Sequence, residues 1–68
     1  MLTMFSVGEV QKAIENHEKR LNIAKEIDDR AAQGQAYGNL RVAYFFLGDF
    51  RKVIEYLEKN LNIAAIDR

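Results

Sequence analysis

The sequence predicts a small all-α domain built from antiparallel helix-turn-helix units. Apolar residues recur at three- and four-residue steps along most of the 68-residue chain, which is the period of an amphipathic helix. Proline is absent, so nothing interrupts these stripes except a few glycines. An internal repeat of forty residues indicates that the helices belong to similar units. We therefore expect about one and a half repeats in a single domain over residues 1–68, with three main helices after a short N-terminal helical segment.

The repeat appears when the sequence is shifted by forty positions. Residues 5–28 then lie over residues 45–68, and eleven of these twenty-four pairs are identical. The longest identical run aligns residues 21–24 with residues 61–64. A period of this length is typical of solenoids, whose units bury their apolar faces only against neighbouring units.

A turn at Gly8 is expected to separate the first two elements. Residues 1–7 are mostly apolar and are interpreted as the remnant of a first helix. Residues 9–27 are predicted to form the second helix, because Ile14 and Leu21 share one apolar stripe. The glycine and the acidic residue that follows it at this turn return forty residues later, so both turns are expected to work alike.

A second glycine separates the last two helices. Residues 30–47 are predicted to form the first helix of the next repeat, with a cap from Asp28 or Asp29 at its start. Gly48 is expected to supply the turn into its second helix, over residues 49–65.

The stretch from residue 36 to residue 55 resembles the tetratricopeptide repeat. Its matching residues are Ala36, Tyr37, Asn39, Leu40, Ala43, Tyr44, Leu47, Gly48, Asp49, Phe50, Lys52, Ile54 and Glu55. Residues 18–30 and the forty-residue spacing are similar to the subfamily in G-protein-signalling modulators of the Pins type. The likeness covers nearly all of the chain from Phe5 onward. It implies helix pairs stacked into a right-handed superhelix, with a concave groove that holds an extended peptide or a helix.

The resemblance also implies a binding face. Asn39 stands where the family has an asparagine that hydrogen-bonds a bound peptide, and Gln35 shares its helix face. The predicted groove residues are Gln35, Asn39, Val42 and Phe46. Arg41 and Val53 depart from the pattern, since the family has small residues at both positions. We expect this added bulk to cost about 1–3 kcal/mol, unless the Arg41 side chain turns outward.

The predicted helix over residues 30–47 is apolar on almost every side of its second half. A helix of that kind is normally buried on every side. Three helices from one chain can hardly bury this helix on every side. We therefore predict a symmetric homodimer, in which a second chain covers the remaining apolar surface. Its predicted contact residues are Met4, Phe5, Val42, Phe45, Phe46, Val53 and Leu57. Subunits either pack as rigid three-helix units or exchange helices through an unbroken helix over residues 26–31, and the aspartates in that segment favour the first route.

Several function classes are disfavoured by composition. The chain has no cysteine and one histidine, His17, so we predict no metal site, no cofactor and no enzyme activity. Ten basic and ten acidic residues leave no net charge to attract nucleic acid. The longest apolar run, residues 42–47, is far shorter than the roughly 20 residues of a membrane span. The expected location is the cytoplasm.

Two function hypotheses follow. In the first, the chain is a self-associating scaffold, and its abrupt start within a repeat suggests an excised or engineered segment. In the second, it is a natural module that binds a peptide of another protein through the groove around Asn39.

Overall fold

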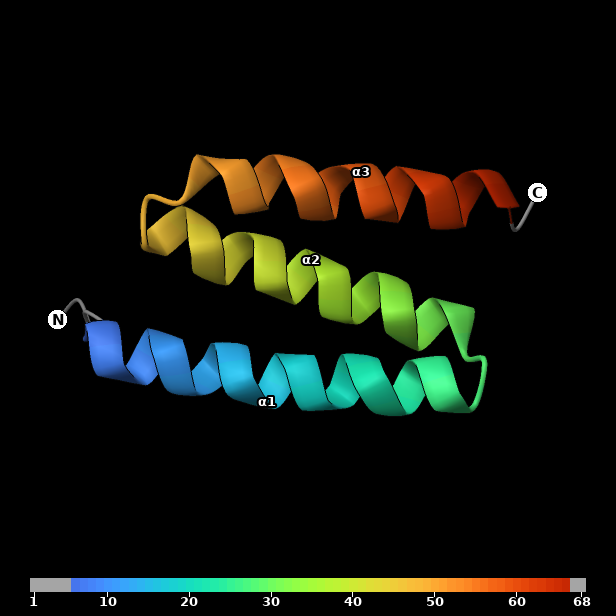
Figure 1. Cartoon of the computed structure of the whole chain (residues 1–68), viewed down its shortest axis with the longest axis horizontal. Coiled ribbons are helices and arrows are strands. Elements are labelled where there is room, and N and C mark those ends of the chain that lie inside the picture. The colour runs from blue at the N-terminus through green and yellow to red at the C-terminus, as the bar shows by residue number, and fades with distance from the viewer. Residues whose placement is uncertain (1–5, 67–68) are drawn as a thin grey trace, which may run out of the picture.

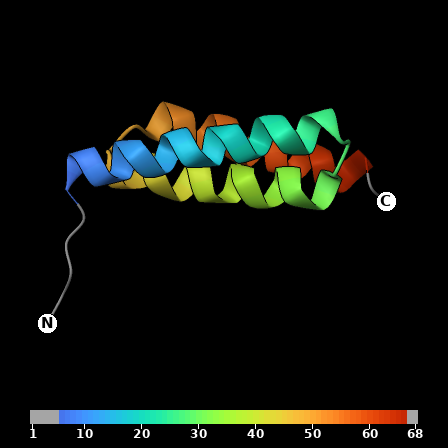
Figure 2. The same ribbon diagram turned by 90° about the horizontal axis from the view of Figure 1, so that it is seen from below.

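The computed structural model describes residues 6–66, which fold into three antiparallel α-helices (Figure 1). They are α1 (Val7–Glu26), α2 (Arg30–Phe46) and α3 (Phe50–Ile66). No strand occurs in this range, so the predicted all-α helix-turn-helix architecture is confirmed. In the view of Figure 2, α2 is displaced to one side of the other two helices. It contacts both of them, whereas the backbones of α1 and α3 make no contact within the described residues.

The two interhelical turns have the same construction. In the first, Asp28 takes a left-handed conformation with φ 56°, and the amide of Asp29 donates to the carbonyl oxygen of Ala24 at 2.8 Å. In the second, Gly48 has φ 76°, and the following amide donates to the carbonyl oxygen five positions earlier at 3.0 Å. A left-handed residue with this hydrogen bond is a common way to end a helix. The predicted turn at Gly48 is confirmed.

Aspartate side chains begin the helices that follow these turns. Asp29 accepts a hydrogen bond from the amide of Ala32 at 3.0 Å, and Asp49 accepts one from Lys52 at 3.3 Å. These bonds satisfy amides that have no partner inside the helix. The predicted cap on α2 is confirmed. Residues 26–31 therefore do not stay helical, and the helix-exchange alternative has no support from this structure.

The start of α1 differs from the prediction. Ser6 caps the helix, because its hydroxyl accepts a hydrogen bond from the amide of Glu9 at 3.1 Å and lies 3.2 Å from the carboxylate of the same residue. Val7 and Gly8 are consequently part of α1, so the predicted turn at Gly8 is wrong. Residues 1–5, with the predicted contact residues Met4 and Phe5, lie outside the described range.

The core lies where α1 and α3 converge on the covered side of α2. Leu40 is fully buried at its centre. The other buried residues of this cluster are Val10, Ile14, Leu21, Ala36, Tyr37, Ala43 and Tyr56. Only Tyr56 comes from α3, so the core depends mainly on the packing of α1 against α2.

Tyrosine rings fill the junction between α2 and α3. The Tyr56 ring centroid lies 5.7 Å from that of Tyr37 and 5.7 Å from that of Tyr44. Burial, and then the neighbouring Tyr44 hydroxyl and Glu18 carboxylate, raise the pKa of Tyr56 to about 12. The ammonium group of Lys52 lies 5.9 Å from the Tyr56 ring centroid, on the outer side of this stack. These rings therefore serve packing.

Two glycines of α2 face Asn60 of α3. A Cβ atom added at Gly34 or at Gly38 would lie 3.8 Å from the side chain of Asn60, which is ordinary contact distance. Arg41 and Val53, where we expected added bulk, are both half-buried. Neither of these two side chains is forced into the core.

The two glycines that the repeat aligns should respond oppositely to alanine. We expect Gly48→Ala to lower the free energy of unfolding by about 1–2 kcal/mol, because a side chain at φ 76° is strained. Gly8→Ala should raise it by about 0.5–1 kcal/mol, because Gly8 is helical and an added Cβ meets only the Ser6 hydroxyl at 3.9 Å. Urea unfolding followed by circular dichroism measures both changes. Equal losses in the two variants would contradict the assignment of Gly8 to α1.

Candidate protein-binding surfaces

The open side of α2 carries the four predicted groove residues. At about 100° per residue, positions 35, 39, 42 and 46 share one face of a helix, opposite the tyrosines of the core. Gln35, Asn39, Val42 and Phe46 are all exposed on this face. The structure therefore brings together the predicted set, and its role in binding stays a prediction.

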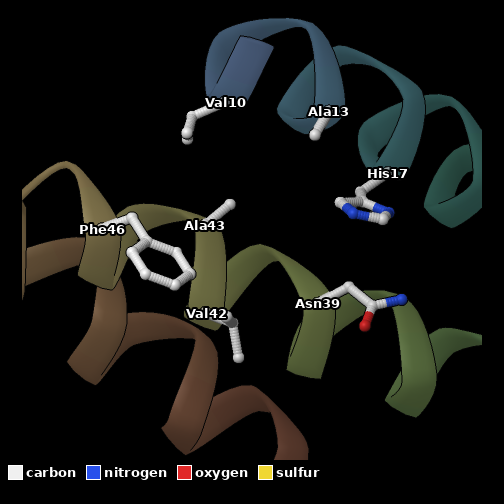
Figure 3. A pocket seen from close by; sticks show the side chains of 7 residues that line it. All are labelled: Val10, Ala13, His17, Asn39, Val42, Ala43 and Phe46. Carbon is white, nitrogen blue, oxygen red and sulfur yellow. The ribbon is translucent and has the colours of Figure 1, made fainter. Parts of the chain in front are cut away.

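A hollow of about 210 Å³ lies between this face and α1 (Figure 3). Val10, Ala13 and His17 point down from α1, and Ala43 points up toward them from α2. The remaining lining residues are Asn39, Val42 and Phe46. The lining is apolar at the Phe46 end and polar at the end where His17 and Asn39 lie.

A second hollow, of about 240 Å³, continues along the same two helices. Asn39 lines both hollows and therefore connects them. The second hollow is more polar, with Arg20 from α1 and Gln35 from α2 in its lining. The pair of neighbouring hollows is apolar at the end where Phe46 lies and polar at the end where Arg20 lies. We call this the α1/α2 groove.

His17 is the unusual residue of the α1/α2 groove. Its Nδ1 atom is buried and has no hydrogen-bond partner in the described part of the chain. Leaving such an atom unpaired costs about 1–3 kcal/mol. The sequence placed His17 on the apolar stripe but gave no sign that its nitrogen lacks a partner. Within residues 6–66, no group of three or more His, Cys, Asp or Glu side chains is placed so that it could hold a metal ion.

A second surface begins at the other edge of α2. The ring centroid of Phe45 lies 6.3 Å from that of Phe46 and 6.1 Å from that of Phe50, in edge-to-face geometry. Phe45 is 58% exposed and Phe50 is 59% exposed. The predicted contact residues Val42 and Leu57 are also exposed. Another predicted contact residue, Val53, is less accessible because it is half-buried. Phenylalanines thus carry an apolar surface from α2 onto α3.

Sequence reasoning did not assign three exposed apolar residues of α3 to a contact surface. They are Phe50, Ile54 and Leu61. Of the stripe that contains them, Leu57 was among the predicted contact residues. Among the described residues, no helix covers this face of α3.

No helix in the described range is both long and apolar enough to cross a membrane.

Comparison with known proteins gives a partial match to one signalling protein. The chain is 53% identical over 36 residues to human G-protein-signaling modulator 1, and 47% identical over 38 residues to the mouse and rat proteins of the same name. These matches cover 53% and 56% of this chain, but the chain spans only 5% to 6% of the relatives' length. No family model matches the chain, and no solved structure matches it. The similarity supports a relation to G-protein-signaling modulators over about half of the chain.

Proposed function

We propose that this chain is a protein-interaction module that associates with a second copy of itself through the apolar surface shared by α2 and α3. The observation that supports this most is the exposure of Phe45, Phe50 and Leu57 on adjacent helices. Large exposed apolar patches mark interaction sites, because hiding them from water is favourable. The relation to a signalling modulator agrees with a role in protein interaction.

Chain size supports the same proposal. A domain of about 60 residues buries only about 60% of the surface that its unfolded chain exposes. Without disulfides, such domains are commonly stabilised by oligomerisation, and this chain has no cysteine. Association would bury Phe45 and Leu57 once in each subunit, so each contact contributes twice.

The proposed dimer predicts a specific loss on substitution. Sedimentation equilibrium at micromolar concentration should show a dimer for the wild-type chain. Phe45→Ser with Leu57→Ser should raise the dissociation constant at least about tenfold, because each removed side chain contributes on the order of 1–3 kcal/mol when buried.

The matched control changes two similarly exposed residues at the C-terminal end of α1, Ile23 and the capping residue Ile27. Ile23→Ser with Ile27→Ser removes side chains that are 57% and 65% exposed but lie away from the proposed interface. The dissociation constant should stay within about twofold of the wild-type value. Circular dichroism checks that each variant stays helical. A folded wild-type monomer at these concentrations would exclude self-association.

A second candidate function is the binding of a peptide or helix in the α1/α2 groove. The unpartnered Nδ1 of His17, beside Asn39, favours it. We propose that the ligand places an apolar side chain against Val42 and Phe46 and a polar group near His17. The guanidinium of Arg20 at the other end favours a carboxylate there.

Isothermal titration tests the groove with peptides from proteins that bind Pins-type modulators. We expect measurable heat with the wild-type chain and at least about a tenfold loss of affinity for Asn39→Ala, because the peptide then leaves a hydrogen bond unmade. His17→Leu should weaken binding while raising stability by about 1 kcal/mol, since the buried unpaired nitrogen disappears.

Asn22→Ala serves as the control, because Asn22 is an exposed asparagine on α1 that lines neither hollow. Its affinity should match that of the wild-type chain. Absence of heat with every peptide would remove the groove proposal and leave the dimer proposal intact.

A further inference from the structure

The exposed apolar residues of α3 form one straight stripe. They are Phe50, Ile54, Leu57 and Leu61, spaced by four, three and four residues. This is the spacing of the core positions of a heptad, which pack against a neighbouring helix. The stripe lies on a face of α3 that no described helix covers.

The same stripe occurs on α1, where it is covered. Shifting by forty positions aligns Ile54 with Ile14 and Leu61 with Leu21. Ile14 and Leu21 are each 7% exposed because α1 packs against the antiparallel helix α2. Ile54 and Leu61 are 57% and 61% exposed. This face is therefore one that, elsewhere in the same chain, holds an antiparallel helix.

We propose that α3 of a second copy covers this stripe, antiparallel and related by a two-fold axis that passes between residues 55 and 56. This inference rests on the proposed self-association and specifies its interface. The axis places Phe50 opposite Leu61 of the second copy and Ile54 opposite Leu57. Apolar residues then meet apolar residues along the whole stripe. A two-fold pair closes on itself and does not grow into a filament.

Charged residues on one edge of the stripe favour a second copy of this chain as the partner and favour the antiparallel orientation of its α3. Arg51 and Glu58 are both exposed and occupy equivalent heptad positions on one edge. In the antiparallel pair, Arg51 and Glu58 of the second copy lie within about 3 Å of the same height along the helix axis, at a rise of about 1.5 Å per residue. The two-fold axis generates this pair twice. A parallel pair in register turns this edge toward Val53 and Asn60 of the second copy instead, so it gains no contact between opposite charges.

The opposite edge of the stripe carries no charge. Val53 and Asn60 lie there, on the side that approaches α2, and both are half-buried. They introduce no repulsion between the two copies. Phe45 of α2 touches Phe50, so the stripe is continuous with the exposed surface of α2.

Charge reversal tests this interface without disturbing the core. Arg51→Glu places two carboxylates together at each contact, and Glu58→Arg places two guanidinium groups together. Each variant alone should dimerise about tenfold more weakly than the wild-type chain at low salt. An equimolar mixture of the two should regain wild-type affinity, because each mixed pair restores both opposite-charge contacts. Sedimentation velocity of the separate and mixed proteins, with circular dichroism as a folding check, provides the readout.

Glu15→Arg is the control, since Glu15 is an exposed glutamate of α1 away from the stripe. It should dimerise like the wild-type chain, and its mixed dimer with Arg51→Glu should stay weaker than the wild-type dimer, because one of the two contacts still pairs two carboxylates. A wild-type dimer that responds to neither reversal, or a mixture that stays as weak as its components, would overturn the α3 pairing while self-association stands. A monomeric wild-type chain would overturn both.

Discussion

The contact of α2 with two helices whose backbones do not meet is the constraint on which this structure depends. Leu40 is fully buried because α2 contacts both α1 and α3. Since the backbones of α1 and α3 make no contact, α2 is the one helix among the described residues that packs against each of them. The arrangement therefore buries one helix well and leaves apolar faces open on its neighbours. Both proposed binding surfaces arise from this asymmetry.

The polarity of two aligned positions on α1 and α3 agrees with this asymmetry. His17 on α1 and Leu57 on α3 occupy aligned positions. The half-buried position carries the histidine, and the exposed position carries the leucine. An isolated domain would favour the reverse, because burying an unpaired polar atom and exposing an apolar side chain both cost free energy. In the proposed dimer, a second copy over Leu57 would remove the second of these costs.

Much of the fold was predictable from the sequence, because helix periodicity and cap chemistry are local. Asp29 and Gly48 act as their neighbours indicate. Gly8 does not form the predicted turn. Ser6 offers a side-chain cap that the aligned residue Phe46 cannot offer, and so α1 starts before Gly8 instead of after it. The site was harder to predict. A stripe such as the one containing Ile54 shows that a face is apolar, but only the structure shows whether anything covers it.

Two neighbouring phenylalanines of α2 belong to different proposed surfaces. Phe46 lines the α1/α2 groove, whereas Phe45 contacts Phe50 at the start of the α3 stripe. Every residue that lines the groove comes from α1 or α2. The proposed dimer contacts, Phe45 and the α3 stripe, line neither hollow, so in that dimer each copy would keep its groove for a ligand. The chain would then present two equal grooves related by the two-fold axis, which favours ligands with two copies of a binding segment, because the second segment binds at a high effective concentration.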